Sequence, residues 1–217
     1  MRFVITAGPT REAIDPVRYI SNRSSGKMGY ALAEAALEAG HDVVLISGPV
    51  TLDPPSRAEL ISVLNSDQMH DEVHRQVDDC DVLVMCAAVA DYKPANASAQ
   101  KIKKRGETFS LELIPTRDIL ASLPGQDRQF LVVGFAAETN DVEENAKKKL
   151  RTKNCDVVVA NDVSAPDSGM ESDANEVTIF TRDGESQKIS RAPKKNVARE
   201  LIKIFENVRE KCLTKKS

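Results

Sequence analysis

The sequence predicts an α/β fold with a Rossmann-like, doubly wound and mostly parallel sheet. Several short runs of valine, isoleucine and leucine are apolar throughout, as expected of parallel strands that are covered on both faces. These runs alternate with amphipathic segments of helical length, which is the pattern of βαβ units. Because crossovers between parallel strands are right-handed, we expect helices on both faces of the sheet.

The chain opens with a buried strand at residues 3–7, which contains the apolar run Phe3-Val4-Ile5. Small residues then begin a helix predicted at 25–39. The same two periodicities continue along the chain and predict the other elements in order. These are strands at 42–47 and 59–63, a helix at 66–77, strands at 81–86 and 129–135, a helix at 141–152, a strand at 155–160 and a last helix at about 193–212.

Two segments interrupt this alternation. The first, residues 87–116, is a polar segment with a basic run and an alternating strand at 109–114; we call it the flap. A long loop inside a compact domain is more often functional than idle. The second, about 176–190, alternates around a turn and predicts a β-hairpin extension. No linker is visible, so we expect one domain over residues 1–217, with a frayed charged tail at 211–217.

Composition excludes several classes of protein. The 30 basic and 33 acidic residues give a net charge of −3, which does not favour a nucleic-acid partner. No apolar run approaches the roughly 20 residues of a membrane span. The N-terminus shows no signal-peptide pattern, and the four cysteines form no CxxC pair. We therefore expect a cytoplasmic protein whose thiols are structural.

The start of the first predicted helix is a candidate anion site. Ser24, Ser25 and Gly26 would leave backbone N–H groups at the positive end of the helix dipole, where phosphate binds well. A helix start that serves only tight packing remains the alternative. The dinucleotide fingerprint G-x-G-x-x-G is absent after the first strand, as are a P-loop and a Tyr/Lys pair four residues apart. A nicotinamide-dependent oxidoreductase therefore remains an alternative that the fold allows but that no motif supports.

Polar residues near the expected carboxyl edge of the sheet are further candidates. The Arg18 guanidinium is suited to clamp phosphate or carboxylate, and the Asn22 amide is suited to a polarised oxygen. Asp91 follows a buried strand and is a candidate ligand for Mg²⁺ through water, or for a ribose. As isolated residues, all three are equally compatible with loop caps and turns.

Two groups of lysines could stabilise phosphate charge. Lys101, Lys103 and Lys104 lie on the flap, which would have to close over the sheet edge. Lys149 and Lys153 are four residues apart and share one helical face. The alternative in both cases is an ordinary solvated surface.

Several of these segments together resemble the phosphopantothenoylcysteine synthetase family, also called phosphopantothenate–cysteine ligase, of the bacterial CTP-dependent type. The resemblance covers nearly the whole chain and rests on many separate stretches. They are Ile5 to Glu12, Ile14 to Gly29, Ala87 to Tyr92, Lys101 to Lys104, Gly134 to Thr139, Ala160 to Ser164, and the loop Gly169, Ser172, Asp173 and Asn175.

The resemblance implies a ligase of coenzyme A biosynthesis. The phosphopantothenate carboxylate would attack the α-phosphate of CTP to give an acyl-cytidylate and pyrophosphate, and cysteine would then displace CMP. It also implies Mg²⁺, a homodimer, and a phosphopantothenoylcysteine decarboxylase that is either fused or separate. This chain begins directly at the synthetase's first strand. Spacing alone does not distinguish CTP from ATP, and a non-catalytic nucleotide-binding regulator remains an alternative.

Site roles follow from the resemblance residue by residue. Asn22, Arg18 and Lys101 would be catalytic, and Lys103 and Lys104 complete the flap motif. The chain has Thr116-Arg117 where the family has Asn-Pro, and Met170 where it has Phe. Asp91 would hold Mg²⁺. The implied nucleotide-binding residues are Ser24, Ser25, Gly26, Met85, Cys86, Ala87, Asp91, Arg117, Asp118, Ile119, Leu120, Phe135, Lys149 and Lys153.

Overall fold

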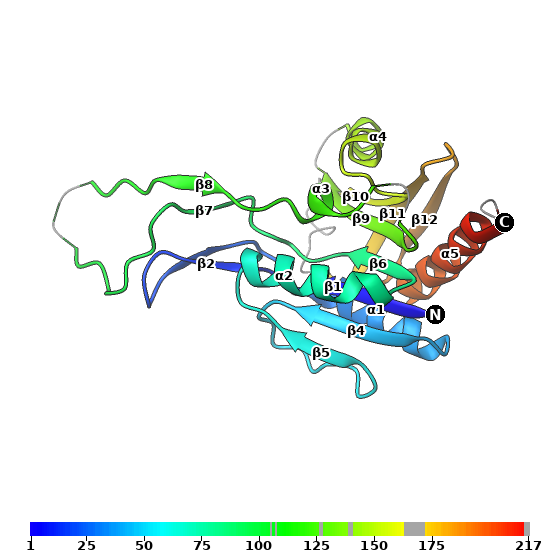
Figure 1. Ribbon diagram of the computed structural model, residues 1–217, viewed down its shortest axis with the longest axis horizontal. Helices are drawn as coiled ribbons and strands as arrows, with labels where there is room; N and C mark the ends of the chain where they lie inside the picture. Colours follow the sequence, from blue (N-terminus) through cyan, green and yellow to red (C-terminus); the bar gives the residue numbers. More distant parts are fainter. Residues whose placement is uncertain (105, 107, 126–127, 139–140, 163–171, 215–217) are drawn as a thin grey trace.

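A computed structural model describes residues 1–104, 106, 108–125, 128–138, 141–162 and 172–214. In this part of the chain, an eight-stranded sheet forms the centre of the fold (Figure 1). Its parallel strands are, in spatial order, β5 (Glu59–Ser62), β4 (Asp42–Ser47), β1 (Arg2–Ala7), β6 (Val82–Met85), β9 (Leu131–Glu138) and β10 (Val157–Asp162). The hairpin β11 (Ala174–Thr181) and β12 (Ser186–Pro193) then extends the sheet antiparallel to β10.

This order confirms the predicted doubly wound fold. From β1 the chain first moves outward through β4 to β5, and it then returns to the other side of β1 as β6. The order of the strands therefore reverses between β1 and β6. In open α/β sheets this reversal leaves a crevice at the carboxyl ends of the two strands, where ligands bind.

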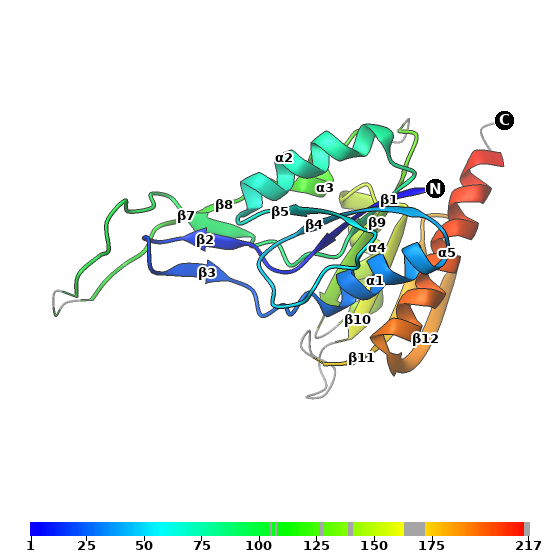
Figure 2. The same cartoon turned by 90° about the horizontal axis from the view of Figure 1, so that it is seen from below.

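Helices cover both faces of the sheet. The long helices α1 (Lys27–Glu38) and α5 (Lys194–Thr214) lie on one face (Figure 2). The other face is covered by α2 (Ser66–Gln76), the 3₁₀ turn Val77–Asp79, α3 (Ile119–Ser122) and α4 (Val142–Thr152). None of the described helices is long and apolar enough to cross a membrane.

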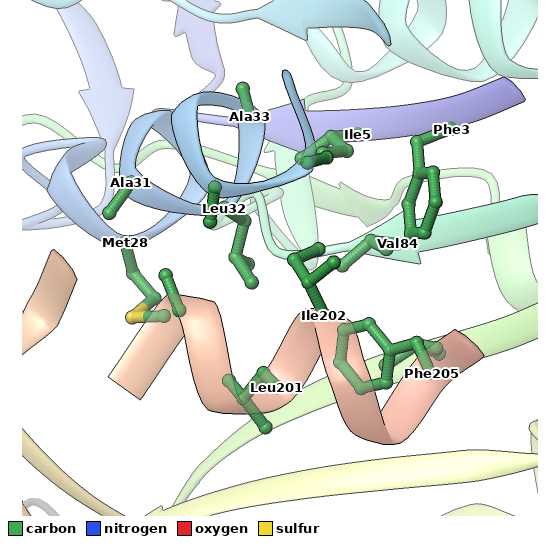
Figure 3. Packing of buried hydrophobic residues seen from close by; sticks show 14 of the residues in the cluster. Phe3, Ile5, Met28, Ala31, Leu32, Ala33, Val84, Leu201, Ile202 and Phe205 are labelled. Atoms are coloured by element: carbon green, nitrogen blue, oxygen red, sulfur yellow. The ribbon is translucent and has the colours of Figure 1, made fainter. Parts of the chain in front are cut away.

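Each face has its own apolar core. On the α1/α5 face, Leu32 of α1 and Ile202 and Phe205 of α5 pack over Phe3 and Val84 of the sheet (Figure 3). All five side chains are fully buried or nearly so. The fold thus follows from strands that are apolar on both sides and helices that are apolar on one side.

Two two-stranded ribbons project from the carboxyl edge of the sheet (Figure 1). Between the first strand and the first helix, where the sequence analysis predicted no strand, the chain forms the hairpin of β2 (Arg11–Ala13) and β3 (Tyr19–Ser21). In the flap, β7 (Tyr92–Pro94) pairs with β8 (Leu113–Pro115). The strand predicted at 109–114 is wrong for residues 109–112, because β7 offers a strand partner only at the base of the flap.

A buried carboxylate joins the flap to the β2–β3 hairpin. Asp15 is only 3% exposed, and its carboxylate accepts hydrogen bonds from the Arg18 guanidinium and, at 3.1 Å, from the N–H of Ile102. Arg18 also donates to the Ile102 carbonyl at 2.9 Å. The hydrogen bond from Arg18 is the main cause that holds the pKa of Asp15 well below its usual range. These contacts position the flap beside the hairpin.

The C-terminal elements agree with the predicted hairpin and last helix. The helix α5 continues to Thr214, beyond the position where the sequence predicted fraying to begin. In its last turn, the Thr214 hydroxyl donates to the carbonyl of Lys211 at 3.0 Å, and the Lys211 ammonium lies 3.4 Å from Glu185. The remaining residues of the predicted tail, 215–217, lie outside the described residues.

We expect Gly29→Ala to destabilise the fold. A Cβ at Gly29 would lie 2.6 Å from the Cβ of Ala7 and 3.2 Å from the carbonyl oxygen of Thr6, so α1 would have to move away from β1. Overpacking of this kind costs about 1–3 kcal/mol, which outweighs the roughly 1 kcal/mol that alanine gains in a helix. Urea unfolding should show a lower midpoint at unchanged slope.

Gly125→Ala is the matched control, because a Cβ at Gly125 would meet nothing within 4 Å. Its midpoint should equal that of the original protein. Equal stability of the Gly29→Ala protein would show that α1 and β1 are not in the close contact described.

Candidate functional site

A cleft of about 690 Å³ opens at the carboxyl edge of the sheet, where the strand order reverses. This volume is within the range of small-molecule sites. Its walls come from the start of α1, the segment after β6, the start of α3, one face of α4 and the ends of β9, β10 and β11. The cleft therefore lies where the fold class predicts a ligand.

The start of α1 forms one end of the cleft. Gly26 is the N-cap of the helix, and its φ of 77° lies in the left-handed region that favours glycine. The Ser24 hydroxyl accepts the N–H of Gly26 at 3.4 Å, and the Ser25 hydroxyl accepts the N–H of Lys27 at 3.5 Å. Both hydrogen bonds are long, so an anion at the positive helix end can replace them. Ser24 and Gly26 line the cleft, whereas Ser25 does not.

Residues 86–91, which we call the exit loop, form the floor. Asn22 reaches this loop from the end of the β2–β3 hairpin, and its amide nitrogen lies 3.1 Å from the carbonyl oxygens of both Ala88 and Val89. Thr116 donates its hydroxyl to the Ala90 carbonyl at 2.6 Å. Asn22 is thus brought into the cleft, as predicted from the sequence, and it contacts the backbone of the exit loop there.

Two carboxylates line the described cleft, and they differ in their partners. Asp118 caps α3 by accepting the N–H of Ala121 at 3.0 Å, and it pairs with Lys153. Burial raises the pKa of Asp118, but these two hydrogen bonds outweigh it and the net shift is downward. Asp91 is exposed and makes no ion pair with any described residue. Asp91 is therefore the carboxylate that remains available to a cation or a hydroxyl group.

The second wall of the cleft combines lysines with apolar side chains. Lys149 donates to the carbonyl of Phe135, and Lys153, the C-cap residue of α4, pairs with Asp118. Both lysines line the same wall of the cleft. The wall also contains Met85, Cys86, Ala87, Ile119 and Leu120. Burial raises the pKa of the Cys86 thiol to about 12, so this thiol stays protonated at neutral pH.

Arg117 lines the cleft, but its guanidinium is engaged elsewhere. It lies 3.1 Å from a carboxylate oxygen of Asp67 and 2.8 Å from one of Asp71, both on α2. Asp67 also pairs with Lys93 of the flap. Arg117 therefore joins α2 to the segment before α3, and its side chain is less available to a ligand than the sequence analysis implied.

Three buried polar residues of the cleft were not predicted as site residues. Asn161 and Asn175 are 8% and 5% exposed, and the side-chain oxygen of each has no hydrogen-bond partner among the described residues. Lys194, the first residue of α5, is 5% exposed and lines the same corner. Burial is the main cause that lowers its pKa. Buried polar atoms without partners are rare in native proteins, so this corner is suited to a polar ligand group.

Little in the sequence indicated that these three residues meet in one corner of the cleft. Lys194 begins a basic pair with Lys195, which is typical of a surface. Asn161 and Asn175 lie within stretches that resemble the synthetase family, and that was their only signal. The three residues meet only because β11 and β12 pair antiparallel next to β10. No local sequence pattern indicates that this hairpin brings them beside α1.

Besides Ser25, four residues predicted for the site do not line the described cleft. Three of them lie on the flap, and Arg18 lies in the β2–β3 hairpin, where its side chain contacts Asp15 and Ile102. The flap extends away from the sheet in both views (Figures 1 and 2). The four residues are Arg18, Lys101, Lys103 and Lys104. Their roles in the site remain predictions.

Comparison with known proteins now identifies the family. The family model described as the DNA/pantothenate metabolism flavoprotein C-terminal domain matches residues 1–208. The chain belongs to this family. The resemblance indicated by the sequence motifs is confirmed at this level.

Individual relatives agree with the family match. The chain is 49% identical over 200 residues to a protein of Bacillus subtilis named coenzyme A biosynthesis bifunctional protein CoaBC, covering 92% of this chain and 49% of the relative. The protein of the same name from Escherichia coli K12 is 46% identical over 189 residues, covering 85% and 47%. The chain thus spans about half the length of the curated relatives it matches.

A solved structure shares the fold. The crystal structure of the C-terminal domain of a coenzyme A biosynthesis bifunctional protein CoaBC superposes with a TM-score of 0.82 and 43% sequence identity. The match covers 97% of this chain and 96% of that domain. The described sheet and helices therefore have the same fold as that domain.

Proposed function

We propose that the protein is a CTP-dependent phosphopantothenate–cysteine ligase of coenzyme A biosynthesis. The observation that carries the proposal is a single cleft that combines a helix N-terminus, the Asn22-bound exit loop and a lysine wall. The relatives, of which this chain matches about half the length, are named for coenzyme A biosynthesis. An enzyme that activates an acid with a nucleotide must hold the phosphates and the acid close together and stabilise the charge that develops, and these three parts can do so.

The two ends of the cleft suit the two ends of a nucleoside triphosphate. The phosphates would lie at Ser24 and Gly26, where the helix dipole and the backbone N–H groups favour negative charge. The nucleoside would lie against Phe135, Ile119 and Leu120, with Lys149 and Lys153 beside it. The volume of the cleft, about 690 Å³, leaves room for a second substrate at the exit loop.

The reaction would proceed in two displacements. A carboxylate oxygen of phosphopantothenate attacks the α-phosphorus of CTP, and the bond to the β-phosphate breaks to release pyrophosphate. The amine of cysteine, after loss of a proton to solvent, then attacks the acyl carbon, and CMP leaves. Asn22, which contacts the exit loop, would hold the acyl-cytidylate, and the cationic wall would stabilise the charge that develops on phosphate.

The polar groups of the cleft fit a magnesium ion that accompanies CTP. Asp91 offers a carboxylate without a cationic partner in the described part of the chain. Oxygen ligands are those that Mg²⁺ prefers, and it usually keeps several waters and phosphate oxygens. When bound, the ion would neutralise charge on the phosphates.

We further infer that the protein is a homodimer that brings the flap lysines to a cleft. Several large apolar side chains are exposed on the flap and the β2–β3 hairpin, among them Val17, Tyr92 and Phe109, which are 59%, 55% and 57% exposed. Pairing of the flap ribbons across a two-fold axis would cover them. The same contact would restrain Lys101, whose proposed role is to cover the intermediate.

The proposal extends to the surroundings of the enzyme. The relatives are bifunctional by name, and the partner we expect is a phosphopantothenoylcysteine decarboxylase, fused or separate. The described cysteines are all free thiols, which suits a reducing cytoplasm.

The central test is release of pyrophosphate. With Mg²⁺, CTP and phosphopantothenate, the protein should release pyrophosphate, and addition of cysteine should release CMP. ATP in place of CTP should give at least tenfold slower release if the nucleoside wall selects cytosine. CTP binding without pyrophosphate would instead indicate a non-catalytic nucleotide-binding protein, and fluorescence changes with NADPH alone would indicate an oxidoreductase.

Asn22→Asp should abolish ligation without loss of the fold. The amide nitrogen now faces the carbonyls of Ala88 and Val89, and a carboxylate there would repel both of them as well as a phosphate. We expect the rate of product formation to fall at least a hundredfold. Asn196→Asp, on the exposed surface of α5, is the control and should keep full activity. An active Asn22→Asp protein would remove Asn22 from the proposed mechanism.

The homodimer can be tested by light scattering after gel filtration. The expected mass is twice the chain mass of 23.8 kDa. Phe109→Ser should shift the protein towards monomer, because Phe109 is an exposed apolar residue of the flap. Leu213→Ser, at a 47% exposed residue near the end of α5, should leave the dimer intact. A monomer at micromolar concentration would contradict the inference.

A further inference from the structure

Two threonine hydroxyls hold the exit loop, although neither threonine lines the cleft. Thr6 is in β1 and Thr10 lies just after it, and both residues are 0% exposed. β1 pairs with β6 only as far as Thr6 and Met85. Beyond that point the strands separate, so the backbone N–H groups of the exit loop can no longer find partners in a regular ladder.

The hydroxyl of Thr6 takes the place of the missing ladder. Its oxygen lies 3.1 Å from the N–H nitrogens of both Cys86 and Ala87 and accepts both hydrogen bonds. The same hydroxyl lies 3.5 Å from the carbonyl of Val84, to which it donates. A hydroxyl has one donor and two acceptor positions, so Thr6 uses all three to shape the start of the loop.

Thr10 plays the corresponding part further along the loop. Its hydroxyl accepts the N–H of Ala90 at 3.0 Å, and its own N–H donates to the carbonyl of Ala88 at 3.3 Å. Ala88 in turn donates its N–H to the carbonyl of Gly8 at 2.9 Å. The segment after β1 therefore fixes the exit loop at several successive residues.

This pattern leaves the cleft with a defined set of backbone groups. The N–H groups of Cys86, Ala87, Ala88 and Ala90 are all bound by β1 or the segment that follows it. Within the described part of the chain, the N–H of Val89 has no acceptor, and Val89 lines the cleft. The threonines thus determine which backbone donor of the exit loop remains available to a ligand.

Packing alone does not require threonine at these positions. A fully buried strand residue is usually valine or isoleucine, and valine has the same shape as threonine. A buried hydroxyl is costly unless it is hydrogen-bonded. Its presence at both positions is explained by the N–H groups of Ala87 and Ala90, which would otherwise have no acceptor in the described part of the chain.

We propose that Thr6 and Thr10 are positioning residues that set the geometry of the exit loop for substrate binding. They act through the backbone of residues 86–90 and do not touch the substrates. The kinetic consequence rests on the proposed ligase function, whereas the structural consequence does not.

The structural consequence is tested by amide hydrogen exchange, followed by NMR in the full chain without ligands. Thr6→Val should speed exchange at Ala87 at least tenfold and leave Ala90 protected, whereas Cys86 keeps a second acceptor in the carbonyl of Val84 at 3.2 Å. Thr10→Val should do the reverse. Thr178→Val is the matched control, because the Thr178 hydroxyl makes no hydrogen bond in the described structure, and exchange in the loop should not change.

Kinetics then separate positioning from packing. Thr6→Val should raise the KM for phosphopantothenate at least tenfold, and the amide left without an acceptor should also lower the melting temperature. Thr6→Ser keeps the hydroxyl and loses the methyl group, so it should restore KM even though the cavity lowers the melting temperature. If Thr6→Val does not fold, Thr10→Val tests the loss of a loop-binding hydroxyl, and Thr6→Ser tests the loss of a methyl group alone.

The outcomes distinguish this proposal from the proposed function. Unchanged amide exchange in folded Thr→Val variants would overturn the positioning role whatever the activity. Equal damage by serine and valine would also overturn it, because it would indicate packing. Faster exchange at the predicted amides, in a protein that releases no pyrophosphate, would support positioning and reject the ligase.

Discussion

The cleft depends on the separation of β1 and β6 at their carboxyl ends. Up to Thr6 and Met85 the two strands form a regular ladder, and beyond that point their backbones pair again only at one bridge, between Pro9 and Ala88. Buried N–H and C=O groups need partners, so the segments that diverge must be held by other atoms. The side chains of Thr6, Asn22 and Thr116 supply them. A binding site at the point where the strand order reverses therefore depends on nearby side chains that hydrogen-bond the backbone groups of the diverging segments.

Close backbone contacts complete this arrangement. Glycine is required where α1 meets the sheet, because a Cβ at Gly26 would lie 2.7 Å from Val50. At Gly48 a Cβ would lie 1.9 Å from the carbonyl oxygen of Pro9, a clash with backbone that a side-chain movement cannot relieve. These contacts bring the helix N-terminus near the exit loop. The anion site and the loop are thus parts of one packed unit.

The parts of the site that lie next to a strand in sequence were predictable. A buried apolar run followed by polar residues places Asp91 at the sheet edge, and small residues at a helix start place Ser24 and Gly26 there. The position of Lys101 was not predictable, because the flap is held by Asp15 and Arg18 through contacts distant in sequence. The alternation at 109–112 indicated a strand, but a strand also needs a partner.

The antiparallel extension explains why the end of the chain contributes to a site built at its start. β11 and β12 run out from β10 and back, so α5 begins at the same edge of the sheet as α1. The N–H of Lys194 donates to the carbonyl of Asp173 at 2.9 Å, which fixes the first turn of α5. The side chain of Lys27 at the start of α1 pairs with the carboxylate of the same Asp173. The starts of both helices are thereby tied to one residue. The positive ends of α1 and α5, together with the two lysines, act on the same corner of the cleft, and this favours an anionic ligand there.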